Sequence, residues 1–110
     1  RALAEEAELV RSLGMTYHHI PVVWDNPTPA DFDTFTRVME AEQAKVVLVH
    51  CAANYRATAF VTLYAMDALG WSAEQADLVI APIWEPHHYP VWEAFIAAAK
   101  ARIQKTVSFI

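Results

Sequence analysis

Apolar residues recur every three or four positions through five segments of the chain, the spacing that gathers them on one side of an α-helix. Helices are therefore expected over about residues 1–13, from 29 onward, 56–69, 73–80 and 91–104. Capping residues mark two of the starts, since Thr28 precedes Pro29 and Ser72 forms a capping box with Gln75. Gly70 is a natural stop for the third helix.

Two other segments have the pattern of β-strands. Residues 15–23 alternate and contain β-branched and aromatic side chains, and residues 45–50 form a short, nearly continuous apolar run. Because helices alternate with these segments, we expect an α/β fold with a parallel sheet flanked by helices. Two strands cannot form a stable sheet alone, so further strands must come from a missing N-terminal segment or from another chain. We favour the first alternative and expect one or more N-terminal strands to be missing from this chain.

Composition narrows the class of protein. The length of 110 residues indicates one domain over residues 1–110, and 55% hydrophobic with 19% charged residues is typical of a globular chain. The net charge of −5 argues against a nucleic-acid partner, and no apolar run is long enough to predict a membrane partner. Nothing at the start resembles a signal peptide, so a cytoplasmic location is expected.

The single cysteine, Cys51, lies between the second expected strand and the third expected helix. In an open α/β sheet, ligands bind at this edge. Backbone N–H groups of the residues that follow can converge on an anion, and the same surroundings favour a thiolate, which is a nucleophile. A guanidinium fork fits an oxyanion. The sequence therefore predicts a nucleophile beside an oxyanion cradle formed by Ala52, Ala53, Asn54, Tyr55 and Arg56.

The stretch "VHCAANYRAT" at residues 49–58 resembles the phosphate-binding loop of the cysteine-dependent, protein-tyrosine-phosphatase-like superfamily. It is most similar to a small bacterial branch that includes β-lactamase-hydrolase-like phosphatase domains, and the similarity extends over "IPVVWDNPTPADF" and "IWEPHHYPVWEAFI". The resemblance implies a phosphorylated or other oxyanionic substrate and a reaction without a cofactor. It also implies these roles: Cys51 as nucleophile, Arg56 as phosphate clamp, Asp25 as general acid, His50 as orienter of the loop and Thr58 as hydrogen-bond donor to the thiolate.

One spacing departs from that family. Five residues separate cysteine and arginine in the active phosphatase pattern, whereas four separate Cys51 from Arg56. Asn54 and Thr58 keep the phosphatase spacing, and Ala57 takes the place of the arginine. A four-residue spacing resembles rhodanese-type sulfurtransferases, whose cysteine carries a persulfide. Two alternatives therefore stay open, namely sulfur transfer through Cys51 and a non-catalytic module that binds phosphate or phosphoproteins.

Several candidates also have a purely structural interpretation. Asp25 can cap a turn, and Thr58 can cap the first turn of a helix. Tyr55 can stack on a substrate ring or pack on the domain.

Two pairs of adjacent histidines, His18–His19 and His87–His88, suggest metal binding at first sight. Neighbouring side chains on a strand point to opposite faces, so the first pair cannot chelate one ion there. With no supporting carboxylate–histidine spacing, no metal site is expected.

Overall fold

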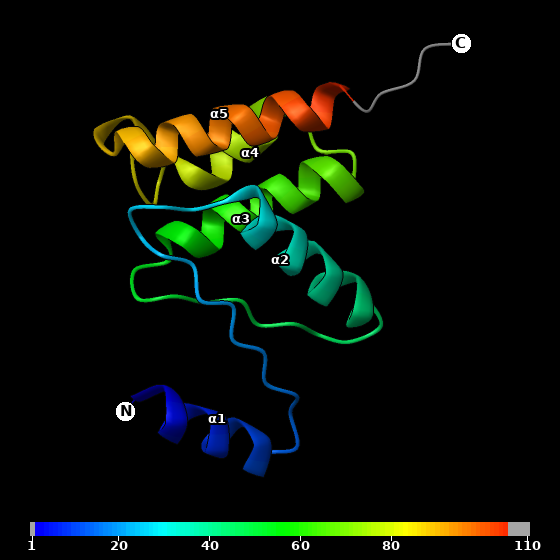
Figure 1. Ribbon diagram of the computed structural model, residues 1–110. Coiled ribbons are helices and arrows are strands. Elements are labelled where there is room, and N and C mark those ends of the chain that lie inside the picture. Colours follow the sequence, from blue (N-terminus) through cyan, green and yellow to red (C-terminus); the bar gives the residue numbers. More distant parts are fainter. Residues whose placement is uncertain (1, 106–110) are drawn as a thin grey trace.

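The computed structural model describes residues 2–105, which form five α-helices and one short 3-10 turn (Figure 1). The elements are α1 (Ala2–Ser12), α2 (Pro29–Ala41), α3 (Tyr55–Ala68), α4 (Ala73–Ile80), η1 (Pro86–His88) and α5 (Pro90–Lys105). The expected helices are confirmed to within one or two residues at most of their ends, which is the usual scatter of helix boundaries.

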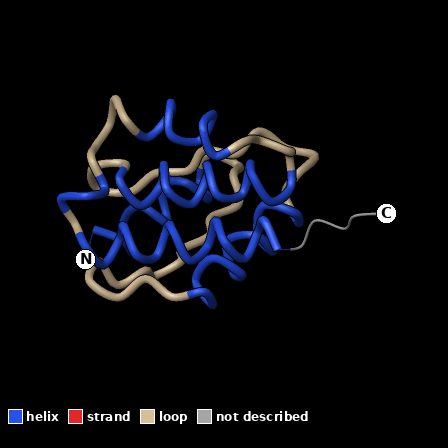
Figure 2. Tube along the Cα trace, turned by 90° about the horizontal axis from the view of Figure 1, so that it is seen from above, coloured by secondary structure: helices blue, strands red, loops and turns tan. Residues whose placement is uncertain are grey.

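The expected parallel sheet is wrong. Figure 2 shows helices joined by loops, and no residue between 2 and 105 belongs to a strand. The two segments expected as strands, 15–23 and 45–50, form neither strand nor helix. They connect α1 to α2 and α2 to α3 (Figure 1).

Neither segment forms a strand because, in the part of the chain that the structure describes, neither pairs with a neighbouring extended segment. A strand is defined by ladder hydrogen bonds to a neighbour, and an apolar run without a neighbour does not make one. The run at 46–49 was expected to be covered on both faces, yet Val46 and Leu48 are 104% and 84% exposed. Val49 does pack against the core, although it is only partly buried.

Helix α3 is the centre of the core. It carries more buried residues than any other helix described, and it packs against α2, α4 and α5. Phe60 of α3 packs against both neighbouring helices. Its ring centroid lies 6.0 and 5.5 Å from those of Phe32 and Phe35 in α2, and 5.7 Å from that of Phe95 in α5. These apolar contacts hold the start of α3 in a fixed position.

Two capping boxes fix where α2 and α4 begin, as the sequence predicts. The Thr28 hydroxyl accepts the N–H of Asp31 at 3.2 Å, and the Asp31 carboxylate accepts the N–H of Thr28 at 2.9 Å. Ser72 and Gln75 make the same reciprocal pair at 3.1 and 2.8 Å. Each box satisfies two backbone donors that a helix start leaves free.

Helix α1 is set apart from the other helices (Figure 1). Glu6 joins it to the rest of the chain, because its carboxylate accepts the Tyr17 hydroxyl at 2.8 Å and lies 3.2 Å from His50 Nε2. The hydrogen bond to Glu6, helped by desolvation, raises the pKa of Tyr17. None of the helices described between residues 2 and 105 is long and apolar enough to cross a membrane.

Candidate functional site

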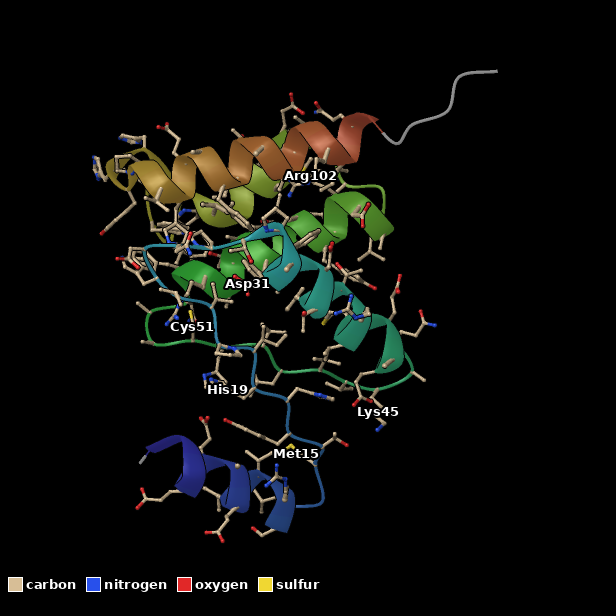
Figure 3. The ribbon with its side chains drawn as sticks, in the orientation of Figure 1. Met15, His19, Asp31, Lys45, Cys51 and Arg102 are labelled. Atoms are coloured by element: carbon tan, nitrogen blue, oxygen red, sulfur yellow. The ribbon has the colours of Figure 1, made fainter. Side chains whose placement is uncertain are left out.

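Cys51 lies at the N-terminal end of α3. Figure 3 shows its sulfur beside the start of that helix, and the side chain is half-buried. The backbone N–H of Ala57, in the first turn, donates to Cys51 Sγ at 3.4 Å. This donor is one that a helix leaves unpaired, and the helix dipole favours negative charge at the same place. The sulfur therefore accepts a hydrogen bond from a free backbone donor at the start of α3.

The loop between Cys51 and α3 makes a sharp turn at Asn54. Asn54 has φ 64° and ψ 11°, the left-handed conformation, and among residues 2–105 it is the one non-glycine residue with positive φ. Asn adopts this conformation at less cost than most residues, because its short polar side chain can form local hydrogen bonds. Ala52, Ala53 and Asn54 are exposed, so an anion can reach their backbone.

Arg56 links the Cys51 loop to the segment before α2. Its Nη1 donates to the carbonyl of Val22 at 2.9 Å, and the side chain is half-buried. A guanidinium has five N–H donors in a fixed fork, so this bond engages one of them. The structure therefore gives Arg56 a tethering role that its sequence position did not indicate, without excluding contact with an anion.

Thr58 makes its hydrogen bonds within α3 and to the core. Its hydroxyl lies 2.8 Å from the Asn54 carbonyl and 2.9 Å from the Tyr55 carbonyl, to which it can donate. It also accepts the indole N–H of Trp84 at 3.0 Å. The hydroxyl thus bonds to carbonyls of the preceding turn and to an indole instead of capping a free backbone N–H, and the part of the chain described shows no hydrogen bond from Thr58 to Cys51.

His50 and Asp25 both lie at the surface. The His50 side chain is 53% exposed and faces Glu6 of α1. Asp25 is exposed on the turn at residues 24–25. That turn is held from two sides, because Trp92 Nε1 donates to the Trp24 carbonyl at 2.6 Å while Arg56 binds Val22. The Asp25 turn is thus attached to α5 through Trp92 and to the start of α3 through Arg56.

An aromatic cluster covers the start of α3, and the sequence did not reveal it as a group. It consists of Trp24, Tyr55, Trp84, Tyr89 and Trp92. Tyr55 stacks on Trp84 with centroids 4.9 Å apart and an interplanar angle of 4°. Tyr55 therefore packs on the domain, and the cluster joins the Asp25 turn to α3 and α5.

The chain is similar in structure and sequence to two crystal structures of a putative phosphatase (DUF442) from Shewanella putrefaciens CN-32. One is 36% identical with a TM-score of 0.81, over 90% of this chain and 62% of that one. The other is 37% identical with a TM-score of 0.80, over 91% and 64%. The chain thus spans less than two thirds of the length of these proteins. No family model and no curated protein matches it.

Proposed function

We propose that this chain is a cysteine-dependent phosphatase-like domain in which Cys51 attacks the phosphorus of a phosphate ester. The observation that carries the proposal is the hydrogen bond from the Ala57 N–H to Cys51 Sγ at the start of α3. It supports the proposal because the free N–H groups of a helix N-terminus bind oxyanions, and the Cys51 sulfur contacts one of these groups. Similarity to a putative phosphatase supports the same class of substrate.

The reaction has two steps that this chain's residues supply. The Cys51 thiolate forms a sulfur–phosphorus bond while the phosphorus–oxygen bond to the leaving group breaks, and Asp25 gives its proton to the leaving oxygen. Water then attacks phosphorus, the thiolate leaves, and the proton from water returns to Asp25. Backbone N–H groups of residues 52–57 and the Arg56 fork hold the equatorial oxygens.

The short Cys–Arg spacing sets an expectation for the rate. Ala57 contacts the sulfur from the position where the phosphatase pattern has arginine, and Arg56 is tied to Val22. A guanidinium one residue early emerges about 100° around the helix. Since a misplacement of about 1 Å can reduce a rate by about 10²-fold, we expect anion binding with weak hydrolysis.

Hydrolysis of p-nitrophenyl phosphate tests the proposal. Cys51→Ser should abolish turnover, and Arg56→Ala should reduce it. Arg37→Ala is the matched control and should leave turnover unchanged. Arg37 is exposed on α2, and among the described residues its side chain bonds only to Thr34 of the same helix. Mass spectrometry of a rapidly quenched reaction should show a phosphoryl group on Cys51. Turnover that persists in Cys51→Ser would rule out the nucleophile.

Asp25 is tested with two leaving groups. Asp25→Asn should slow hydrolysis of an alkyl or unactivated phenyl phosphate by about 10²–10⁴-fold, with a much smaller loss for an activated aryl phosphate. Only poor leaving groups need the proton. Equal losses on both substrates would show that Asp25 shapes its turn and gives no proton.

The four-residue spacing between Cys51 and Arg56 favours a second candidate, sulfur transfer. In that reaction, the Cys51 thiolate attacks the outer sulfur of thiosulfate, the sulfur–sulfur bond of thiosulfate breaks, and sulfite leaves. A stable additional sulfur on Cys51, lost in Cys51→Ser, would favour this activity. Phosphate binding with neither phosphoryl nor sulfur transfer would identify a non-catalytic binding module.

A further inference from the structure

Three exposed side chains that can bind a metal converge at η1, between α4 and α5. Glu85 Oε1 lies 3.3 Å from His87 Nε2 and 3.4 Å from His88 Nε2. One ligand atom from each of the three residues lies within 4.8 Å of the other two. Both imidazoles are thus directed at the same carboxylate oxygen.

These separations match those between ligand atoms that share one cation. N–H···O bonds are most often 2.9–3.0 Å long, and both observed separations are longer. Two imidazolium ions would also repel each other, since the two ring centroids are 4.2 Å apart. In tetrahedral zinc sites with bonds of about 2.0–2.1 Å to nitrogen and oxygen, neighbouring ligand atoms are about 3.3–3.4 Å apart.

The turn holds the ligands in this arrangement. The N–H of His88 donates to the Glu85 carbonyl at 3.0 Å, and the N–H of Tyr89 donates to the Pro86 carbonyl at 2.8 Å. Pro86 fixes its own φ angle inside the turn. At the start of the segment, Trp84 is 5% exposed in the core. The backbone that carries the ligands is therefore fixed from within and anchored to the core.

The surroundings add negative charge. Glu85 and His87 line a groove between α4 and α5, together with Asp77 and Glu93. The groove's lysine, Lys100, is paired with Asp77 at 2.8 Å. Glu85 and Glu93 have no lysine or arginine partner among the described residues, so the groove that His87 lines carries negative charge, which favours a divalent cation.

We propose that Glu85, His87 and His88 form a binding site for a divalent transition-metal ion, best fitted by Zn²⁺. Two imidazole nitrogens and one carboxylate oxygen make a three-ligand set, and a water molecule completes the tetrahedron. This proposal departs from the expectation of no metal. That expectation rested on a strand position for His18 and His19 and on the absence of a supporting carboxylate–histidine spacing. The 3-10 turn instead brings His87 and His88 to the carboxylate of Glu85. The proposal does not depend on the chemistry of Cys51.

The test is calorimetric titration of the chain with Zn²⁺ in a Cys51→Ser background, because Cys51 is the chain's one thiol and would compete for the metal. We expect one ion to bind per chain. His87→Ala/His88→Ala and, separately, Glu85→Gln should each weaken binding by at least about tenfold, since even outer partners of metal ligands contribute 10–100-fold. Glu85→Gln preserves both imidazoles and the size of the side chain.

The other histidine pair provides the matched control. His18→Ala/His19→Ala removes the same two side chains elsewhere and should leave zinc binding unchanged. Circular dichroism should show that all variants remain folded, because the three ligands are exposed. The proposal is overturned by a parent chain that binds no stoichiometric zinc, by unchanged affinity in either η1 variant, or by an equal loss in the control.

Discussion

Replacing Asn54 with alanine tests the conformation of the Cys51 loop directly. Asn54 is exposed, its side chain makes no capping hydrogen bond, and its φ is 64°. Truncation to alanine therefore removes no described contact, and the conformational cost dominates. An L-residue with a Cβ pays about 1–2 kcal/mol in the left-handed region, and Asn pays less. We expect Asn54→Ala to reduce the free energy of unfolding by about 1 kcal/mol.

Asn54→Gly should leave the free energy of unfolding unchanged or increase it. Glycine reaches positive φ without a steric penalty, although it adds freedom to the unfolded chain. Ala53→Gly is the neighbouring control, because Ala53 does not have positive φ. At position 53, glycine adds conformational freedom to the unfolded chain and relieves no strain in the folded one. We therefore expect Ala53→Gly to reduce the free energy of unfolding by about 0.4–1 kcal/mol.

Urea unfolding monitored by circular dichroism measures these differences, and thermal unfolding gives a second readout. A change of 1 kcal/mol corresponds to about 4 °C in Tm for a chain of this size. The decisive comparison is the order of stability: glycine at or above asparagine, and alanine below both. If Asn54→Ala were as stable as the parent while Asn54→Gly were less stable, the left-handed turn would be refuted.

Two further changes test other contacts. Trp92→Phe removes the indole N–H from the Trp24 carbonyl and should reduce the free energy of unfolding by about 1–3 kcal/mol in urea; an unchanged midpoint would contradict the anchoring of the Asp25 turn. The hydrogen bonds with His18 and Lys45 lower the pKa of Glu42. The ionised Glu42 therefore stabilises the folded state above the ordinary carboxyl pKa, and this stabilisation is lost as the pH falls through the lowered pKa. Glu42→Gln should therefore diminish the fall in Tm between about pH 7 and about pH 3, and an undiminished fall would contradict this assignment.

Local signals in the sequence were sufficient to predict the helices. Thr28 and Ser72 each act on backbone groups within three residues, so the starts of α2 and α4 follow from a few neighbouring letters. Asn54 is a local signal of the same kind, and its left-handed conformation agrees with its place in the phosphatase pattern.

The sheet could not be predicted because pairing is not a local property. Residues 46–49 have the composition of a buried strand, but composition does not supply a neighbour with free N–H and C=O groups. The same limit applies to the site. The bond from Arg56 to Val22 spans 34 positions and the bond from Trp92 to Trp24 spans 68, so neither is visible in a short motif.

The unpaired run at 46–48 has a consequence for colloidal behaviour. Val46, Val47 and Leu48 are all exposed, and Val49 extends this apolar, uncharged run. Extended backbone with open hydrogen-bonding groups and apolar side chains is a template for intermolecular cross-β association. At high protein concentration, this chain should therefore form assemblies that bind thioflavin after a lag phase. Leu48→Lys should lengthen that lag phase, because it adds a charge to the exposed run.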